Sequence, residues 1–223
     1  MKVTTDACLF GAWAINETPP VKKNFQLLDI GTGTGLLALL FAQQFKEAII
    51  DGVELDAAAA KQAKQNVDGC AFGHNVTVIH STINTYQPQK RYDIIVSNPP
   101  FFEKDLAAKS LQRNWAFHDH GLTLKQLLYQ IDQLLAPGGV FFLLLPPKRE
   151  SELLENCTAH HLNLSTRCAV HATDKKAAHC IFYKGKKGEA GSLKTQVPLI
   201  IQGNEKGYSS RAHALLANYY LHL

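Results

Sequence analysis

The sequence predicts an α/β protein in which helices cover both faces of an open, mostly parallel sheet. Apolar, strand-like runs alternate with helical patterns from residue 25 to residue 146, and a glycine-rich turn separates the first strand from the next helix. Two further apolar runs, at residues 165–172 and 178–184, are joined by a short polar turn. We therefore expect parallel βαβ units, followed by an antiparallel hairpin at one edge of the sheet.

The elements of the first part follow from apolar periodicity and from the residues that end each run. The expected strands are short and apolar, whereas the expected helices are rich in leucine or alanine. Asp56 precedes four consecutive alanines and is placed to cap their helix. We expect strands at 25–30, 48–54, 76–80, 92–97 and 140–145, and helices at 36–45, from 57 onward and at 122–135.

The chain, residues 1–223, is expected to form one domain with three parts, and its length suits a single α/β core. Residues 1–24 form an N-terminal segment with a proline-containing linker, and residues 25–146 form a central core. Residues 147–223 form the hairpin, a last strand at 197–202 and a closing helix at 209–223.

The formal net charge of +4 comes from one stretch of the chain, residues 148–194. Charge alone leaves two interpretations open, which are a solvated surface with a lysine-rich hairpin and a patch that contacts phosphate groups. The basic residues of the stretch are Lys148, Arg149, Arg167, Lys175, Lys176, Lys184, Lys186, Lys187 and Lys194.

Composition disfavours several classes of protein. No stretch approaches the roughly 18 consecutive apolar residues of a membrane-spanning helix. The five cysteines are an odd number without a C-x-x-C pair, which predicts reduced thiols in a cytoplasmic protein rather than disulfides or a cysteine-rich zinc site. Residues 7–15 could belong to a secretory signal, but Asp6 interrupts the positive-then-apolar order that such a signal needs.

A glycine-rich turn and two acidic residues predict a nucleoside-binding site. Gly31, Gly33 and Gly35 follow the first strand and open a helix, where glycines let a ligand approach the main chain. Glu54 ends the next strand, 19 residues after Gly35, and can accept hydrogen bonds from both hydroxyls of a ribose. The G-x-G-x-G spacing and the Asp29 carboxylate disfavour a pyrophosphate and suit the ammonium end of S-adenosylmethionine. The central core is therefore expected to bind this cofactor, and a glycine turn without a ligand is the less favoured alternative.

A second motif follows the fourth strand, at the edge where open α/β sheets bind ligands. If the Asn98 amide oxygen and the Pro99 carbonyl each accept an N–H of an exocyclic amine, such as adenine N6, its lone pair can face a methyl sulfonium. Pro99 and Pro100 restrict the backbone and hold both acceptors in place, and Phe101 offers a ring for base stacking. By itself the motif could merely end a strand. After the glycine loop and Glu54, it predicts catalytic roles for Asn98, Pro99 and Phe101.

These motifs together resemble the class I S-adenosylmethionine-dependent amino-methyltransferases and, more narrowly, the tRNA(Val) adenine-N6 methyltransferases. The resemblance covers essentially the whole chain. It implies a Rossmann-like class I methyltransferase fold, with a mostly parallel seven-stranded sheet, an antiparallel C-terminal hairpin and helices on both faces. The superfamily resemblance is carried by segments 28–37, 53–56 and 97–101, and the narrower one by 1–6, Leu9, 11–13, Arg113, Ala116, His118, 122–124, 200–203 and 208–209.

The resemblance implies methyl transfer from S-adenosylmethionine to N6 of the adenosine just 3′ of the anticodon of tRNA(Val), nucleotide 37. It also implies that Thr82 contacts the cofactor, since the family commonly has an acid there that accepts from the cofactor's adenine amine. A threonine can do so only through its hydroxyl. Other departures are Phe117, where the family often has arginine, and Thr4, where glycine is typical. The family usually has residues upstream of Met1.

Several alternatives stay open. The acceptor could be guanine N2 of rRNA or a protein glutamine, and a non-enzymatic alternative is an RNA chaperone that binds S-adenosylmethionine; the lysine-rich stretch favours RNA. His118 and His120 could suggest a metal, but no third ligand is placed, so we expect an exposed loop. The loop at residues 102–121 is expected to face RNA. The expected partner is tRNA, with no membrane and no metal, and the protein is expected to be a monomer.

Overall fold

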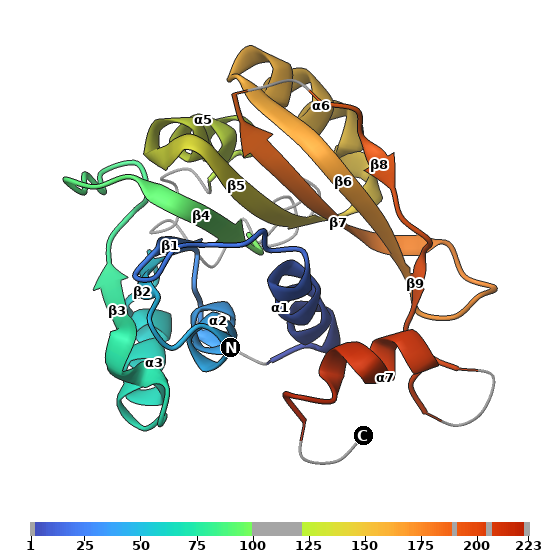
Figure 1. Cartoon of the computed structure of the whole chain (residues 1–223), viewed down its shortest axis with the longest axis horizontal. Coiled ribbons are helices and arrows are strands. Elements are labelled where there is room, and N and C mark those ends of the chain that lie inside the picture. Colours follow the sequence, from blue (N-terminus) through green and yellow to red (C-terminus); the bar gives the residue numbers. More distant parts are fainter. Residues whose placement is uncertain (1–2, 100–121, 189–190, 204–206, 221–223) are drawn as a thin grey trace, which may run out of the picture.

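A nine-stranded sheet runs through the protein in the computed structural model, which describes residues 3–99, 122–188, 191–203 and 207–220 (Figure 1). The strands are β1 (Gln26–Ile30), β2 (Ile49–Glu54), β3 (Val76–His80), β4 (Tyr92–Ser97), β5 (Leu135–Leu145), β6 (Leu162–His171), β7 (Ala178–Lys187), β8 (Lys194–Thr195) and β9 (Leu199–Ile200).

The strand order is β3-β2-β1-β4-β5-β7-β6-β8, and β9 also pairs with β6. Strands β1 to β5 are parallel to their neighbours within that set, whereas β7 is antiparallel to both β5 and β6. The expected parallel sheet with an antiparallel hairpin is therefore confirmed. The seven strands β1 to β7 make up that sheet, and the two-residue strands β8 and β9 extend it beside β6. β9 lies within the strand expected at 197–202, whereas β8 was not expected.

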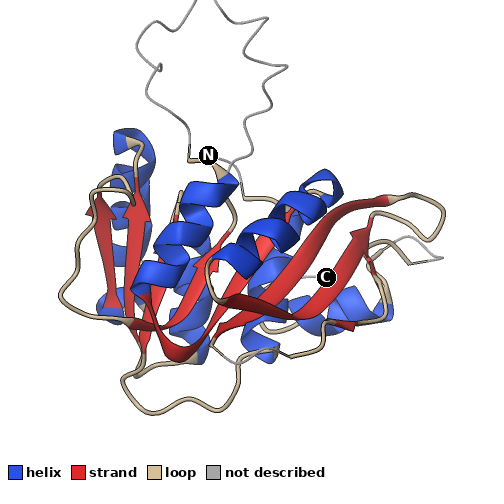
Figure 2. Ribbon diagram, turned by 90° about the horizontal axis from the view of Figure 1, so that it is seen from above, coloured by secondary structure: helices blue, strands red, loops and turns tan. Residues whose placement is uncertain are grey.

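Helices cover both faces of the sheet, as Figures 1 and 2 show. α1, α2, α3 and α7 lie on one face, and α5 and α6 lie on the other. Asp56 caps α3 as expected, since its Oδ1 accepts from the Ala59 amide at 2.7 Å. No helix of the described residues has the length and hydropathy needed to cross a bilayer. The helices are α1 (Thr5–Asn16), α2 (Leu36–Gln44), α3 (Ala57–Asp68), α5 (Leu124–Leu134), α6 (Glu150–Ala159) and α7 (Ser210–Leu216).

The apolar run at residues 7–15 is the buried body of helix α1, in which nine consecutive residues are buried. The helix lies between the sheet, α2 and α7, so every side of it is covered. Trp13 packs edge-on against Phe142 of the sheet at 6.0 Å between ring centroids. At Gly11 an added Cβ would lie 2.5 Å from Leu40, so the absence of a side chain lets α1 and α2 approach closely.

Four boundaries differ from the expected ones by three or more residues. One is the start of β6, which lies at Leu162 rather than at 165. β7 continues to Lys187 instead of ending at 184, because residues 185–187 pair with β6 and residues 185–186 also pair with β5. The ring of Phe141 covers Gly185 and would lie 2.2 Å from a Cβ there. β5 begins at Leu135 rather than at 140, with residues 136–139 forming an irregularity in its pairing with β4. α7 ends at Leu216, so the closing helix is shorter than the 209–223 expected, and residues 221–223 lie outside the described part.

Candidate active site

The carboxyl ends of β1, β2 and β4 meet at one edge of the sheet. They end at Ile30, Glu54 and Ser97, and β1 lies between β2 and β4. The loops that follow these strands are therefore neighbours in space although they are far apart in the chain. The residues expected to hold the cofactor and the substrate come from these loops and from the loop after β3.

The glycine loop turns from β1 across the end of β2. Gly31, Gly33 and Gly35 have φ angles of 70°, 59° and 84°, a region that side-chain-bearing residues rarely adopt. The amides of Gly31 and Thr32 both donate to the Val53 carbonyl, at 2.9 and 3.1 Å. Glycine is required at these three positions because of their backbone conformation, and none of the three places a side chain in the turn.

Asp29 lies beneath this loop and is fully buried. Its Oδ2 accepts from the Thr32 hydroxyl at 2.6 Å and from the Ala38 amide at 3.2 Å, so it links the loop to the first turn of α2. Its Oδ1 has no hydrogen-bond partner among the described residues. Burial raises the pKa of Asp29 to about 7, against the lowering effect of these two donors. The carboxyl therefore shapes the loop from within, and a contact with the cofactor's ammonium end stays a prediction.

Glu54 stands at the end of β2 with both carboxylate oxygens turned to backbone amides. Oε2 accepts from the Gly33 amide at 2.8 Å, and Oε1 accepts from the Asp56 amide at 2.9 Å. The side chain is half-buried and is held against the glycine loop. Each carboxylate oxygen can accept a second hydrogen bond, so the pair of oxygens has the capacity that a ribose diol requires.

Thr82 begins a tight turn after β3, beside Glu54. The Ser81 amide donates to the Glu54 carbonyl at 2.9 Å, which keeps the turn next to the carboxylate. The Thr82 carbonyl accepts from the amides of Thr85 and Tyr86, both at 3.1 Å, and its hydroxyl oxygen accepts from the Asn84 amide at 3.3 Å. The hydroxyl proton of Thr82 remains able to donate.

A hydrogen-bonded cluster behind this turn was not foreseen from the sequence. Asp51, 6% exposed, accepts at Oδ2 from the hydroxyls of Tyr92 at 2.6 Å and Tyr86 at 3.1 Å, and Lys90 lies 2.7 Å from the same oxygen. The two tyrosine hydroxyls are 2.7 Å apart, and burial raises the pKa of Tyr86 to about 12. The cluster ties the loop between β3 and β4 to the middle of β2. The only sequence signal for it was an aspartate within an apolar strand.

Asn98 and Pro99 directly follow β4, at the same edge as the glycine loop. The Ser97 hydroxyl donates to the Ile30 carbonyl at 2.8 Å and is fully buried, so the ends of β4 and β1 are joined. Ile30 pairs with Ser97 at the ordinary strand spacing of about 4.8 Å, so Asn98 and the glycine loop continue from adjacent strand ends. Asn98 is half-buried and Pro99 is buried. Phe101, the third expected catalytic residue, lies outside the described residues.

The structure thus places Asp29, the three glycines, Glu54, Thr82, Asn98 and Pro99 at one edge of the sheet. Their loops belong to four adjacent strands, β3, β2, β1 and β4. Two carboxylate oxygens suited to a ribose, the neighbouring turn of Thr82 and the open space beside Gly31 fit S-adenosylmethionine. The amide and carbonyl acceptors lie on the next strand, where an amine substrate could meet the methyl group.

Much of the basic stretch is bound within the protein. Arg167 forms two hydrogen bonds to Glu150, at 2.5 and 3.1 Å, and Arg149 lies 2.5 Å from Glu152. In the same stretch, Lys187 is paired with Asp132, and Lys184 donates to the Glu17 carbonyl. The stretch as a whole is therefore not one phosphate-binding patch. The interpretation that it contacts phosphate groups can hold only for part of it.

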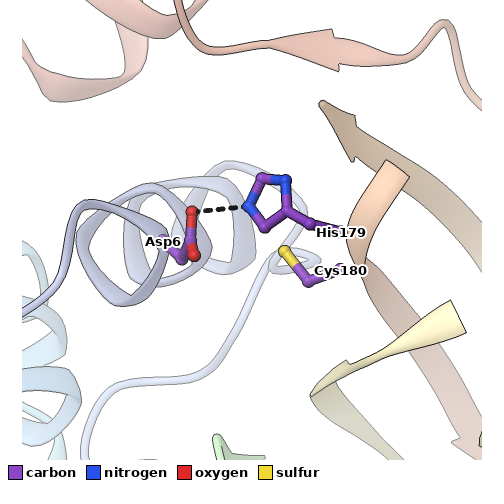
Figure 3. Close-up of side chains that lie close together, drawn as sticks. All are labelled: Asp6, His179 and Cys180. Atoms are coloured by element: carbon purple, nitrogen blue, oxygen red, sulfur yellow. Dashed lines mark hydrogen bonds and ion pairs between the residues drawn. The ribbon is translucent and has the colours of Figure 1, made fainter. Parts of the chain in front are cut away.

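Asp6, His179 and Cys180 come together where α1 meets the start of β7 (Figure 3), with their ligand atoms within 4.8 Å of one another. A pairing irregularity, in which His171 pairs with Ala178 and Val170 with Cys180, makes His179 an extra residue in β7. The His179 Nε2 lies 3.0 Å from Asp6 Oδ1.

A metal is disfavoured at this cluster for two reasons. Burial raises the pKa of the Cys180 thiol, and Asp6 lies in the first turn of α1, where the positive helix end repels a cation. We interpret the Asp6–His179 contact as a clasp between α1 and β7. The expected absence of a metal stays a prediction.

The fold and the site define a class I, S-adenosylmethionine-dependent methyltransferase. The family model described as methyltransferase small domain matches residues 11–155. Among solved structures, the chain is similar to a predicted O-methyltransferase from Agrobacterium tumefaciens, with a TM-score of 0.73, 16% identity and 97% of each chain covered. It is also similar to the glycopeptide N-methyltransferase MtfA complexed with S-adenosylmethionine, with a TM-score of 0.59, 12% identity, and 81% of this chain and 94% of that one covered. At these identities the likeness concerns the fold alone.

Proteins with similar sequences identify the family within this class. A protein of Aeromonas hydrophila is 38% identical over 99% of this chain and 91% of its own length, and one of Dyadobacter fermentans is 41% identical over 79% and 72%. A protein of Proteus mirabilis is 35% identical over 100% and 88%. All three carry the name tRNA1(Val) (adenine(37)-N6)-methyltransferase. The chain belongs to this family of the small-domain methyltransferases, as its motifs led us to expect.

Proposed function

We propose that the protein transfers a methyl group from S-adenosylmethionine to N6 of adenine 37 in tRNA1(Val). The observation that carries the proposal is the placement of Asn98 and Pro99 beside the glycine loop, joined to it by the bond from Ser97 to Ile30. The names of relatives at 35% to 41% identity support the choice of base and RNA. We further propose that the protein acts as a monomer, without a metal, in the cytoplasm.

The residues of the chain would divide the work as follows. Glu54 would accept from the ribose hydroxyls of the cofactor, Thr82 would face its adenine, and the glycine loop would leave room for its methionine end. When bound, the cofactor supplies an electrophilic methyl group on a sulfonium. Asp29 would act through the loop, because its carboxylate is turned to Thr32 and Ala38 rather than outward.

Asn98 and Pro99 would prepare the amine. An adenine N6 is a weak nucleophile because its lone pair is delocalised into the ring. Hydrogen bonds from its two N–H groups to the Asn98 amide oxygen and the Pro99 carbonyl favour a pyramidal nitrogen whose lone pair points away from both acceptors. Positioning the nitrogen toward the methyl group supplies most of the remaining acceleration. The methylated amine is acidic and can lose its proton to water.

The test is to incubate the protein with labelled S-adenosylmethionine, together with either total RNA or a protein extract, and to identify the labelled nucleoside by mass spectrometry. We expect label in N6-methyladenosine of a valine tRNA. Label in N2-methylguanosine would favour an rRNA acceptor, and label in protein glutamine would favour the protein acceptor. Binding of cofactor and RNA without any label would favour the chaperone. Each of these three outcomes contradicts the proposal.

A further inference from the structure

The β6–β7 hairpin extends beyond the edge of the sheet at which the site lies. Ser97 pairs with Leu143, and Leu143 pairs with Tyr183, so these three residues mark one level across the sheet. β7 begins five residues before Tyr183, at Ala178. Since His179 is an extra residue, this corresponds to four residues of β6, from Arg167 opposite Tyr183 to His171 opposite Ala178. At about 3.3 Å per residue, the start of β7 lies about 13 Å past that level on the active-site side. The hairpin tip, residues 172–177, lies farther out and projects from the molecule in Figure 1.

The tip has a defined conformation. The Lys176 carbonyl lies within hydrogen-bond distance, 2.7 Å, of His171 Nδ1, and the Lys176 amide donates to the Thr173 carbonyl at 3.3 Å. At the base of the hairpin, His179 is clasped by Asp6 of α1 at 3.0 Å. The pairing of β7 with both β5 and β6 orients the hairpin relative to the site, and the Asp6 contact adds a link to α1.

The tip also differs from much of the basic stretch in its charges. Arg149, Arg167 and Lys187 are each paired with a carboxylate, whereas Lys175 and Lys176 are exposed and form no ion pair with any described residue. Asp174 is the acidic residue of the tip, which leaves two positive charges against one negative charge. Exposed lysines on a projecting turn can follow a phosphate backbone without having to break an internal contact.

We propose that the tip is an RNA-backbone-binding arm, in which Lys175 and Lys176 contact phosphates of the tRNA away from the methylated nucleotide. The inference rests on the proposed function for the identity of the RNA. It narrows the basic stretch to the two residues whose position and lack of internal ion pairs suit RNA binding. Phosphate contacts of this kind set affinity and orientation, and they do not read the base.

The test compares the wild type with the double variant Lys175→Gln/Lys176→Gln. A control of equal charge is Lys22→Gln/Lys23→Gln, which removes two adjacent exposed lysines located before β1, at the opposite edge of the sheet, where they form exposed ion pairs with Asp93 and Glu47. Affinity for intact valine tRNA is measured by filter binding at several salt concentrations. For the arm variant we expect about five- to tenfold weaker binding, and a slope of log affinity against log salt that is smaller by about one to two.

Two kinetic readouts separate the arm from a structural effect. The arm variant should raise KM for intact tRNA and leave kcat and the affinity for S-adenosylmethionine unchanged, and the effect should shrink with a short anticodon stem-loop. Unchanged tRNA affinity and salt slope, or an equal loss in the control variant, would overturn the arm. A wild type that binds tRNA with the predicted dependence on the tip, but methylates no RNA, would support the arm and contradict the proposed function.

Discussion

The two halves of the sheet hold their charged side chains in different ways. In the cofactor half, β1 to β4 with their loops, Asp29 and Glu54 are turned inward to backbone and hydroxyl donors. In the hairpin half, β5 to β7, charges pair on half-exposed surfaces, as in Arg167 with Glu150. The first arrangement fixes the positions of the two carboxyl groups, because most of their donors are backbone amides. The second fixes little, since partly exposed ion pairs contribute about 0–1 kcal/mol.

The difference suggests how the protein divides its tasks. Chemistry on a single amine needs acceptors held within a fraction of an ångström, and the cofactor half supplies them from strand ends that are joined to each other. Binding a large polyanion needs positive charge at reachable positions more than it needs precision. The four predictions below test this division, and their expected effects decrease from the first to the last.

Asn98→Ala should have the largest effect on the reaction. It removes one of the two acceptors for the amine, and loss of a preorganised electrostatic partner costs about 100-fold or more in kcat. Binding of S-adenosylmethionine by calorimetry should change by less than about twofold, because Glu54 and the glycine loop are untouched. Retained turnover in single-turnover assays with labelled cofactor would contradict the catalytic role.

Asp29→Asn should change the pH dependence of stability. Burial raises the pKa of Asp29 to about 7, whereas the unfolded chain titrates near its ordinary value of about 3.9. The native state therefore keeps a proton that the unfolded state releases, so this contribution to stability is full below about pH 4 and is lost as the pH rises to about 7.

The asparagine introduced by this substitution does not titrate, so the unfolding free energy of the variant relative to the wild type should rise by about 2 kcal/mol from pH 5 to pH 8. Urea unfolding at both pH values measures this. Asp68→Asn, at an exposed carboxylate on α3, is the control and should show a much smaller change. A difference between Asp29→Asn and wild type that is independent of pH would contradict the buried, protonated carboxyl.

Glu54→Gln should weaken binding of S-adenosylmethionine by about tenfold with little change in kcat at saturating cofactor. The substitution replaces one carboxylate oxygen by an NH2 group, which faces the amide of Gly33 or Asp56 and can no longer accept from a ribose hydroxyl. Calorimetry measures the affinity, and Glu47→Gln, an exposed position before β2, serves as the control. An unchanged affinity for S-adenosylmethionine would contradict the assignment of Glu54 to the ribose hydroxyls.

Tyr86→Phe should have the smallest effect of the four. It removes a hydroxyl that lies 3.1 Å from Asp51 and 2.7 Å from Tyr92, and the expected loss of unfolding free energy is about 1 kcal/mol. Because the turn of Thr82 is anchored by this residue, cofactor affinity should also fall by about threefold. Tyr129→Phe, at an exposed tyrosine of α5, should change neither quantity. Equal behaviour of the two variants would show that the cluster does not support the turn.

Several elements could be predicted from the sequence because short-range sterics and periodicity determine them. The positive φ angles of Gly31, Gly33 and Gly35 are a property of the turn itself. Short, continuous apolar runs that are separated by helical segments specify buried parallel strands. Glu54 and Asn98 could be placed at the same edge of the sheet because each lies where a strand ends, and the carboxyl ends of parallel strands meet at one edge. Position in the chain was enough for these residues.

The tertiary structure decided what depends on partners distant in the chain. Residues 185–187 continue β7 because they pair with β6 and, in part, with β5. Residues 7–15 of α1 are buried because the sheet, α2 and α7 surround them. Asp51 accepts hydrogen bonds from Tyr86 and Tyr92, which are 35 and 41 residues away in the chain. Asp6 contacts His179, which is 173 residues away. A sequence states that a residue is charged, but only packing brings a counter-charge to it. This is why the basic stretch could be read from the sequence, whereas the distinction between its paired residues and the lysines of the hairpin tip required the folded chain.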